Sequence, residues 1–474
     1  MDRQFQVKVA LPKGRLLAQT ADLLQRADWG LTDYRESARL YRLTSQRFPG
    51  LLAKMFHEKD IPIQVAVGNY DLGICRLEWV EELLAKYPAS ALVKVKNLGY
   101  GEGILYAVVS RSWGVSTVEE LQVRTGTIRI AGEYPNLAES FALNLRLKKF
   151  SIFPLWGAAE VYPPESADLA VVAGKAAEFQ RYGLVPVSNV LNSSAYLIAN
   201  DRSWVSKDLN KVVASIGDGL VSGLTPSSPG VETVPESVRR YSTGEVAEGT
   251  VRLALPDGHQ QQHTVNLLSK ARIQVDDYPS PTGNRRPVAN VPGVAIKVIR
   301  PQDMPLQVAC GNFDMAITGR DWLREHLYRF PSSPVTELLD LKFGWVRVVA
   351  AISNDLSVND VYGLRQFNGK HPMPLRIASE YVNIADKYAR DNHLGMYRVI
   401  PTWGASEAFL PEDADLLIEN TETGGTLARH NLKIIDTLFE STACLVGNTD
   451  SMNSPVIGQK IKSIVNILRQ AVEG

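Results

Sequence analysis

The side chains best suited to chemistry lie in one stretch, residues 415–432, which reads DLLIENTETGGTLARHNL. The apolar residues 416–418 predict a short strand, and the threonines and glycines after it predict a turn that opens a helix at about Leu427. A strand followed by an acidic residue, a glycine turn and a helix start is an arrangement that suits a bound phosphate.

The turn itself has the groups that an anion needs. Gly424 and Gly425 let the backbone approach closely, Thr423 and Thr426 supply hydroxyls, and the first N–H groups of the helix, at about Leu427, point outward without partners. The turn therefore predicts a cradle for the 5-phosphate of a phosphoribosyl group.

Two carboxylates, Glu419 and Glu422, precede the glycines and have the chemistry to bind sugar hydroxyls or a metal. The alternative is an ordinary strand-to-helix turn capped by threonine, and the stretch alone favours that alternative slightly. The rest of the chain has to decide between them.

Composition excludes several classes of protein. The 474 residues carry 51 Lys+Arg and 51 Asp+Glu, so no overall field directs the chain to nucleic acid or an acidic membrane surface. The charged N-terminal sequence does not resemble a signal peptide, and no apolar run is long enough to span a membrane. Cys75, Cys310 and Cys444 lie far apart, without metal-ligand spacing, which indicates a reducing cytoplasm.

An internal repeat divides the chain. VKVALPKGRLLAQTADLLQRA near the N-terminus matches VRLALPDGHQQQHTVNLLSKA from Val251, and six such matches follow one another with offsets of 243 to 248 residues. The chain is therefore interpreted as a tandem duplication. We expect copy one at 1–223, copy two at 250–474, and a linker at 224–249 that is rich in Pro, Ser, Gly and Glu.

Within each copy, short apolar runs alternate with helical segments, which predicts an α/β fold with parallel sheets covered by helices on both faces. Ser116 and Glu119 predict a capping box at the start of a short helix. About 220 residues with this many strands predict two lobes per copy, with the ligand cleft at the carboxyl ends of the strands.

The motifs of copy two resemble ATP phosphoribosyltransferase, the family that performs the first step of histidine biosynthesis. They are GNFDMAITGRDWL, LLDLKFGWVRVVAA, LRIASEY and DADLLIENTETGGTLARHNL followed by STACLV. Copy one resembles the same family through ALPKGRLL, GNYDLGIC and IAGEYPNLAESF. The resemblance implies an α/β fold of two tandem periplasmic-binding-protein-like (type II) modules, each of two lobes with a central cleft. It also leads us to expect that the family's separate C-terminal regulatory domain is absent.

The resemblance also implies a reaction: ATP attacks phosphoribosyl pyrophosphate through N1 and pyrophosphate leaves. It implies that the ribose and its phosphate are bound by residues 419 and 422–427, that Mg²⁺ accompanies the pyrophosphate without a dedicated protein metal site, and that a few other side chains take part. Catalytic roles are expected for Lys13, Arg15, Arg300 and Glu419, and nucleotide contacts for Asp321, Glu380 and Glu407. The substrate-binding set is Glu419, Glu422, Thr423, Gly424, Gly425, Thr426 and Leu427.

The copies have diverged in complementary ways. Copy one keeps Lys13 and Arg15, where copy two has Asp257 and His259, but it replaces the phosphate loop by VAGKAAEFQRYGL, a sequence that favours continuous helix. A fused pair could therefore form one composite site, with cations from copy one serving copy two. The alternative for both cations is that they are solvated charges.

Other residues have ordinary explanations. Asp71 and Asp314 occur in both copies and are expected to be structural, and Glu407, which has a counterpart in copy one, fits either a structural or a binding role. Arg285 and Arg286 are also candidate cations for the pyrophosphate, but in a Pro/Gly-rich loop such residues are more often surface charges, and that is the expectation here.

Three functions remain open at this point. The first is an active ATP phosphoribosyltransferase in which the two copies pair as a pseudo-dimer. The second is a non-catalytic nucleotide-binding or regulatory member of the same family. The third, a solute-binding module, lacks an export signal. A homo-oligomer or a separate regulatory subunit is compatible with the first.

Overall fold

Each copy folds into two α/β lobes. The computed structural model describes residues 7–38, 40–221, 247–370 and 372–474. We name the lobes 1A (7–97 and 195–221), 1B (103–193), 2A (251–340 and 443–473) and 2B (346–441). The linker predicted at 224–249 lies, up to residue 246, outside the described residues.

Lobe 1A holds a six-stranded sheet in the order β2-β3-β1-β4-β11-β5. Its strands are β1 (Val7–Lys13), β2 (Arg42–Thr44), β3 (Leu51–His57), β4 (Leu72–Arg76), β5 (Leu92–Asn97) and β11 (Ala195–Asn200). Its helices are α1 (Leu17–Arg26), α2 (Asp60–Ala66), α3 (Leu77–Lys86), α7 (Asp201–Ser206) and α8 (Asn210–Val221). The apolar stripe of α1, with Leu17, Leu23 and Leu24 buried, packs against this sheet.

Lobe 1B holds a five-stranded sheet in the order β10-β6-β9-β7-β8. Its strands are β6 (Gly103–Ser110), β7 (Ile128–Gly132), β8 (Phe150–Pro154), β9 (Leu169–Gly174) and β10 (Leu184–Ser193). Its helices are η1 (Arg111–Trp113), α4 (Val118–Gln122), α5 (Pro135–Asn144), η2 (Ala159–Val161), α6 (Ala176–Phe179) and η3 (Gln180–Tyr182).

Lobe 2A repeats the order of lobe 1A without the edge strand β2, as β15-β12-β16-β23-β17. Its strands are β12 (Val251–Pro256), β15 (Val294–Ile299), β16 (Met315–Gly319), β17 (Val335–Asp340) and β23 (Ala443–Asn448), with a small hairpin of β13 (Val275–Asp276) and β14 (Val288–Ala289). Its helices are η4 (Gly258–Gln260), α9 (Gln261–Lys270), α10 (Met304–Ala309), α11 (Arg320–Arg329), α15 (Thr449–Asn453) and α16 (Pro455–Glu473).

Lobe 2B repeats lobe 1B, in the order β20-β19-β21-β18-β22. Its strands are β18 (Val346–Ser353), β19 (Leu375–Ser379), β20 (Tyr397–Pro401), β21 (Leu416–Thr421) and β22 (Leu432–Ser441). Its helices are α12 (Val361–Lys370), α13 (Val382–Asp391), η5 (Ser406–Phe409) and α14 (Gly425–Arg429). The fold is thus the predicted α/β fold of two tandem periplasmic-binding-protein-like (type II) modules, each with two lobes.

The sheets are mixed, so the prediction of parallel sheets was wrong in one respect. β1 pairs in parallel with β3 and β4, but β11 pairs antiparallel with β4 and β5, and β6 pairs antiparallel with β9 and β10. The chain leaves lobe 1A through β5 and returns from lobe 1B through β11, so the returning strand enters its sheet in the opposite direction. Copy two repeats this pattern with β17 and β23.

Two local predictions needed adjustment. The capping box uses Thr117 and Glu120, one residue later than predicted, while Ser116 also donates to the Glu120 carboxylate from its backbone and its hydroxyl. The segment that replaces the phosphate loop forms one short α-helical turn, α6, that continues as η3, and Phe179 within it is buried.

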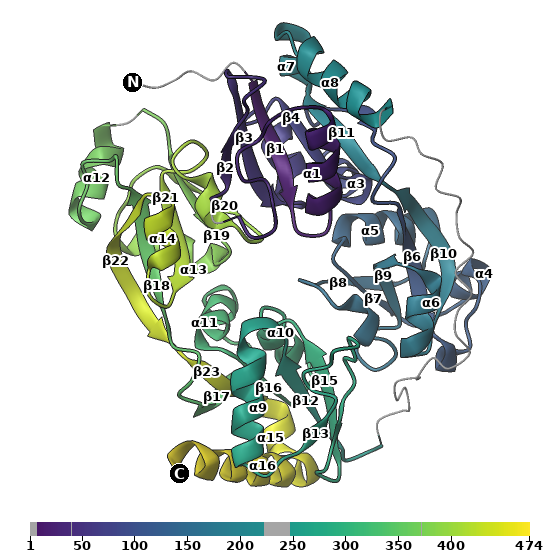
Figure 1. Cartoon of the computed structure of the whole chain (residues 1–474). Coiled ribbons are helices and arrows are strands. Elements are labelled where there is room, and N and C mark those ends of the chain that lie inside the picture. The colour runs from purple at the N-terminus through teal and green to yellow at the C-terminus, as the bar shows by residue number, and fades with distance from the viewer. Residues whose placement is uncertain (1–6, 39, 222–246, 371) are drawn as a thin grey trace.

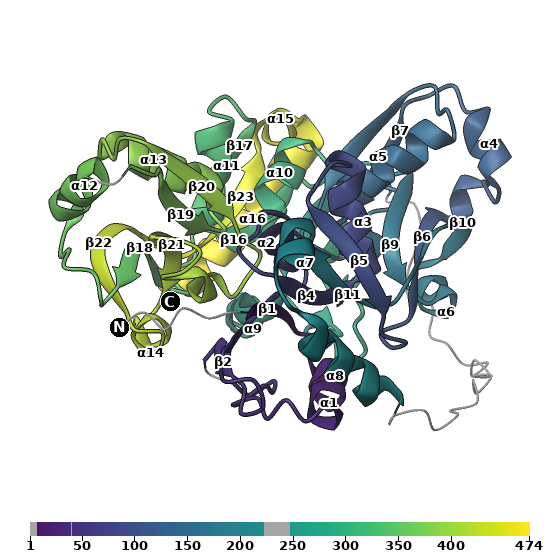
Figure 2. The same ribbon diagram turned by 90° about the horizontal axis from the view of Figure 1, so that it is seen from above.

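The four lobes form a ring in which contacts between the copies alternate with contacts within them (Figure 1). One apolar core joins lobe 1B to lobe 2A, and another joins lobe 1A to lobe 2B. Lobes 1B and 2B consequently lie at opposite ends of the molecule (Figure 2). The predicted pairing of the two copies is therefore a packed arrangement with two extended apolar interfaces.

Matching ion pairs reinforce the two interfaces. Lys54 of lobe 1A, 2% exposed, donates to Glu412 and Asp413 of lobe 2B. Its counterpart in lobe 2A, Lys297, donates to Glu165 of lobe 1B. The duplication has thus preserved the same contact on both sides of a pseudo-twofold axis.

Candidate functional site

The loop that motivated the sequence analysis forms a sharp turn in the structure. β21 ends at Thr421, Gly424 has φ +77°, and α14 begins at Gly425, two residues before the predicted helix start. A left-handed φ suits glycine because other residues carry a Cβ that crowds the following carbonyl. The Thr421 hydroxyl accepts a hydrogen bond from the Gly424 N–H at 2.9 Å and holds the turn closed.

The loop keeps backbone donors available. Thr423 accepts weakly from the Gly425 N–H, and the Thr426 hydroxyl accepts from Arg429 at 2.8 Å. Among the described residues, no acceptor is found for the N–H groups of Thr426 or Leu427. An anion placed at this helix start would receive those two donors.

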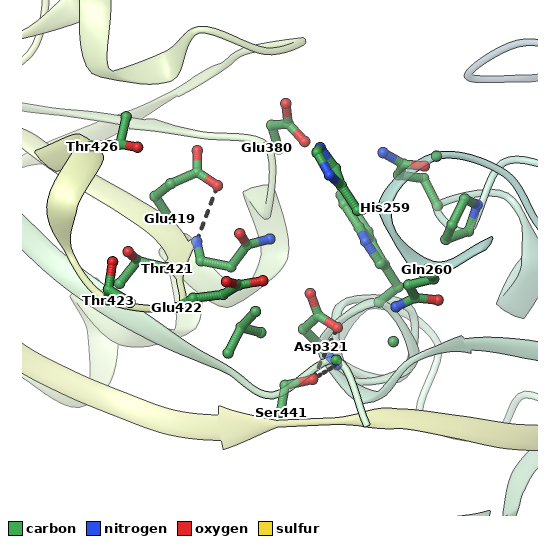
Figure 3. A pocket seen from close by; sticks show the side chains of 18 of the residues that line it. His259, Gln260, Asp321, Glu380, Glu419, Thr421, Glu422, Thr423, Thr426 and Ser441 are labelled. Atoms are coloured by element: carbon green, nitrogen blue, oxygen red, sulfur yellow. Dashed lines mark hydrogen bonds between the residues drawn. The ribbon is translucent and has the colours of Figure 1, made fainter. Parts of the chain in front are cut away.

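A cavity of about 700 Å³ lies between lobes 2A and 2B, and the loop forms one of its walls. Figure 3 shows Glu380, Glu419 and Asp321 between the loop threonines and His259. The structure brings most of the predicted site residues together there: Arg300, Asp321, Glu380, Glu407, Glu419, Glu422, Thr423, Gly425, Thr426 and Leu427. Gly424 shapes the turn without lining the cavity.

Several carboxylates line this cavity, and their charges raise one another's pKa values. Burial, followed by the charges of Glu407 and Asp321, raises the pKa of Glu380 to about 7. Burial, with Glu380 and Glu407 next, raises the pKa of Glu419 well above its ordinary value. An added cation would relieve this repulsion and return both carboxyls to their charged forms.

Asp321 is held in a fixed orientation at the floor of the cavity. It accepts hydrogen bonds from the hydroxyls of Tyr381 and Ser441, and Asn420 donates in turn to Tyr381. Its pKa is raised by burial, with these hydrogen bonds acting in the opposite direction. Since Asp321 belongs to lobe 2A and both Tyr381 and Asn420 to lobe 2B, this chain of polar groups ties the two sides of the cleft together.

Lys13 and Arg15 lie elsewhere. Both line a second cavity, between lobes 1A and 1B, whereas Arg300 lines both cavities and pairs with Asp257 at 3.2 Å. Lys13 reaches the copy-two cavity only indirectly, since it donates at 2.7 Å to the hydroxyl of Tyr41, a copy-one residue that lines that cavity.

The expectation that Arg285 and Arg286 are surface charges was wrong. Arg286 is 7% exposed and binds both oxygens of Glu165 in lobe 1B, and Arg285 pairs with Glu160 of the same lobe. The loop that carries them packs on the other copy, which a single-copy sequence pattern does not reveal. Asp314 is structural as predicted, because Arg252 and Ser451 occupy its oxygens.

Sequence reasoning missed several lining residues. Tyr41 packs in a tilted arrangement on His430, at the end of α14, with ring centroids 4.7 Å apart, and His259 and His263 line the opposite wall. The alignment of the copies offered a signal for His259, which stands where copy one has Arg15. No pattern signalled Tyr41, because its place depends on how the copies pair.

Two further features are absent from the described residues. No group of three or more His, Cys, Asp or Glu side chains there is arranged to hold a metal ion. None of the helices in those residues is both long and apolar enough to cross a membrane.

Comparison with known proteins identifies the family of the chain. The family model described as HisG, ATP phosphoribosyltransferase, matches residues 57–218 and again 300–470. The ATP phosphoribosyltransferase of Prosthecochloris aestuarii is 33% identical over 227 residues, which cover 47% of this chain and 71% of that protein. The enzyme of the same name from Pelotomaculum thermopropionicum is 32% identical over 230 residues, which cover 47% of this chain and 73% of that protein.

Solved structures give weaker matches. The ATP phosphoribosyl transferase (HisG:HisZ) complex from Thermotoga maritima is 22% identical with a TM-score of 0.39, and the match covers 47% of this chain and 99% of that one. A Candida albicans protein with the generic periplasmic binding protein fold is 10% identical with a TM-score of 0.30, over 47% of this chain and 71% of that one. On the two family-model matches and the sequence relatives, this chain belongs to the ATP phosphoribosyltransferase family, as a tandem fusion of two copies.

Proposed function

We propose that the chain is an ATP phosphoribosyltransferase with one working site, the cleft of copy two. It transfers the phosphoribosyl group of phosphoribosyl pyrophosphate to N1 of ATP and releases pyrophosphate. The observation that carries the proposal is the glycine turn at Gly424, which opens into a cavity lined with carboxylates. Copy one, proposed to span residues 1–223, lacks this turn, and the working copy is proposed to span 250–474, after a linker at 224–249.

The loop is proposed to bind the ribose 5-phosphate. The free N–H groups of Thr426 and Leu427 and the Thr423 and Thr426 hydroxyls supply donors without a formal charge. Because the turn is fixed by the Thr421–Gly424 hydrogen bond, these donors need little reorganisation when the phosphate arrives.

The carboxylates are proposed to bind the sugar and the nucleotide. Glu419 and Glu422, beside the loop, accept from the ribose hydroxyls, and the positive charge that develops on the ribose ring in the transition state is stabilised by the same carboxylates. Asp321, Glu380 and Glu407 face the remaining space and are assigned to the nucleotide.

The leaving pyrophosphate requires cations. Arg300 is the one Lys or Arg among the described residues that line the copy-two cavity, so it is assigned to the pyrophosphate. Lys13 and Arg15 would contribute across the shared wall, Lys13 through Tyr41. Arg300 belongs to copy two, so the copy-one contribution to the proposed composite site would come from Lys13 and Arg15.

Mg²⁺ fits the donor set in this cavity. The mutual repulsion of Glu380, Glu407 and Glu419, which contributes to the raised pKa values of Glu380 and Glu419, favours a cation nearby, and a carboxylate oxygen is a ligand that Mg²⁺ accepts. Since the described side chains do not form a complete metal site, the substrate's phosphates would supply the other ligands. When bound, Mg²⁺ would neutralise charge on the leaving pyrophosphate.

The three cysteines are free thiols, which supports a cytoplasmic location for the enzyme. A homo-oligomer or a separate regulatory subunit is compatible with the proposal, and the pseudo-dimer formed by the two copies supplies the core assembly.

The test is an assay of the purified full chain with ATP, phosphoribosyl pyrophosphate and Mg²⁺, followed by pyrophosphate release and by absorbance of the adduct. Both signals are expected together, and both should vanish without Mg²⁺. No adduct at high enzyme concentration would favour the non-catalytic nucleotide-binding alternative. Unchanged turnover in Lys13→Ala and Arg15→Ala would show that copy one contributes structure alone.

A further inference from the structure

The cleft of copy one is open and is lined by several cations that the proposed reaction does not use. A cavity of about 760 Å³ lies between lobes 1A and 1B, slightly larger than the cavity of copy two. Seven Lys or Arg side chains and five Glu side chains line it, so it has an excess of positive charge. Two of the seven, Arg285 and Arg300, come from lobe 2A.

Only some of these cations are paired. Arg76 is bound by Glu58 and Glu78, Arg285 by Glu160 and Asp257, and Arg300 by Asp257. The others have no ion pair among the described residues. These are Lys13, Arg15, Lys59 and Arg181.

Lys59 is an example of a cation in this cleft that has no ion pair with any residue that the structure describes. Its ammonium lies 4.2 Å from the ring centroid of Trp403 in lobe 2B and 5.4 Å from that of Trp79, without a carboxylate partner. Burial lowers its pKa, although neighbouring carboxylates oppose the change. Nearby His57 has its pKa lowered to about 4 by burial and then by Lys59, Arg76, Arg15 and Arg300, which reports the positive potential of the cleft.

The cleft cannot bind a 5-phosphate in the manner of copy two. The segment after β9 enters α6 at Lys175 without a left-handed glycine, and Phe179, 3% exposed, lines the cavity from that segment. A Cβ at Gly174 would lie only 3.0 Å from the Phe179 ring. An anion here must therefore be bound by arginine and lysine side chains, which suits a group with several charges spread along it.

We propose that the cleft of copy one binds a polyphosphate group, either on a nucleotide or free, through Arg181, Arg15 and Lys13 at its rim and Lys59 deeper in the cleft. This site lies in a different cleft from the proposed catalytic site, although Lys13 and Arg15 are also the copy-one cations proposed for the pyrophosphate, and polyphosphate binding does not require that the enzyme be active. Half-buried Trp403 and Trp156 in its wall offer apolar surface to a nucleotide base.

Titration calorimetry of the full chain without Mg²⁺ tests the proposal, with inorganic tripolyphosphate, ATP and adenosine as probes. Tripolyphosphate is expected to bind, and Arg181→Glu should weaken it about tenfold, because a charge-assisted contact becomes a repulsive one. Lys148→Glu, an equal change of charge at an exposed site in the same lobe that lines neither cavity, should alter the affinity less than twofold.

A second variant tests which of the two clefts gives the heat of tripolyphosphate binding. Gly424→Ala, which disturbs the loop of copy two, should leave tripolyphosphate binding unchanged. The proposal is overturned if Arg181→Glu behaves like Lys148→Glu, if Gly424→Ala abolishes the binding, or if neither tripolyphosphate nor ATP binds. Tighter binding of ATP than of tripolyphosphate would identify the ligand as a nucleotide, and equal binding would identify the phosphate chain alone.

Discussion

The two clefts of the molecule have similar walls and opposite charge. Asp321 of copy two is held by Ser441, and Glu78 of copy one is held in the same way by Ser193. However, copy one has Arg76 where copy two has Gly319, and Arg76 pairs directly with Glu78. The copy-two cavity has six carboxylates and one arginine or lysine among its described lining residues, against five and seven in copy one.

This difference shows how a duplicated cleft can diverge while the fold is kept. The residues that join the lobes are conserved between the copies: Glu82 accepts from the N–H groups that open α5, and Glu325 accepts from those that open α13. The residues that face the ligand have changed. Different side chains therefore hold the lobes together and recognise the ligand, so the two roles can be tested separately.

The largest expected effect comes from the loop glycine. Gly424→Ala places a Cβ in the left-handed region, so the turn should shift and kcat/KM should fall about 100-fold. Gly183, at φ +66° in the corresponding segment of copy one, provides the control, and Gly183→Ala should change kcat/KM less than twofold. Equal losses in both variants would mean that the two clefts do not differ in their role.

The second effect concerns the floor of the copy-two cleft. A Cβ at Gly319 would overlap Oδ1 of Asp321, so Gly319→Ala should displace that carboxylate from Tyr381 and Ser441. Loss of about 2 kcal/mol of hydrogen bonding predicts a roughly 30-fold fall in kcat/KM. Gly126→Ala, which meets no atom within 4 Å, is the control and should retain full activity by steady-state kinetics.

The third effect compares two aligned positions, Arg300 and His57. Arg300→Ala should raise KM for phosphoribosyl pyrophosphate about 15-fold, through loss of one charge-assisted contact of about 1.6 kcal/mol. His57→Ala should change it less than twofold, because a pKa of about 4 leaves that ring uncharged at neutral pH. A larger effect at His57 would place the pyrophosphate in the other cleft.

The smallest effect is a dependence on pH at Glu380. Because the Glu380 carboxyl ionises near pH 7, the affinity for Mg²⁺ should rise by at most about tenfold from pH 6 to pH 8. Calorimetry in the presence of pyrophosphate measures this change. Glu380→Gln should remove this dependence, whereas Glu133→Gln, at the aligned position of copy one, should preserve it.

The same carboxyl makes a prediction about stability. Because its folded pKa of about 7 exceeds the ordinary 4.5, the folded chain retains a proton that the unfolded chain releases, so stability should fall as the pH rises from 4.5 to 7. Thermal unfolding at pH 8 should show a higher Tm for Glu380→Gln than for the unaltered chain. A lower Tm would contradict the assignment.

The sequence predicted the architecture well because its signals are local or repeated. The alternation of apolar runs and helices predicted the lobes, the internal repeat predicted the copies, and the loop at 422–427 was placed within two residues of its helix start. The antiparallel return of β11 and β23 was missed, since strand direction depends on how the chain crosses between lobes and not on periodicity.

The contacts between copies were the harder part to predict. Tyr41 enters the copy-two cavity and Arg285 the copy-one cavity, although each lies in a loop whose own sequence reads as exposed. Their positions follow from the packing of lobe 1A on 2B and of 1B on 2A, which is set by apolar cores spread over many distant residues. A composite cleft thus becomes visible only when the copies are placed together.

The alternating ring has a mechanical consequence. Lobes 1A and 2B are fastened together, as are 1B and 2A, while the strands that cross between lobes join each copy internally. Two rigid pairs connected at two hinges form a closed linkage, and a rotation at one hinge has to be accompanied by a rotation at the other. In such an arrangement, any closure of the copy-two cleft would also move the lobes of copy one.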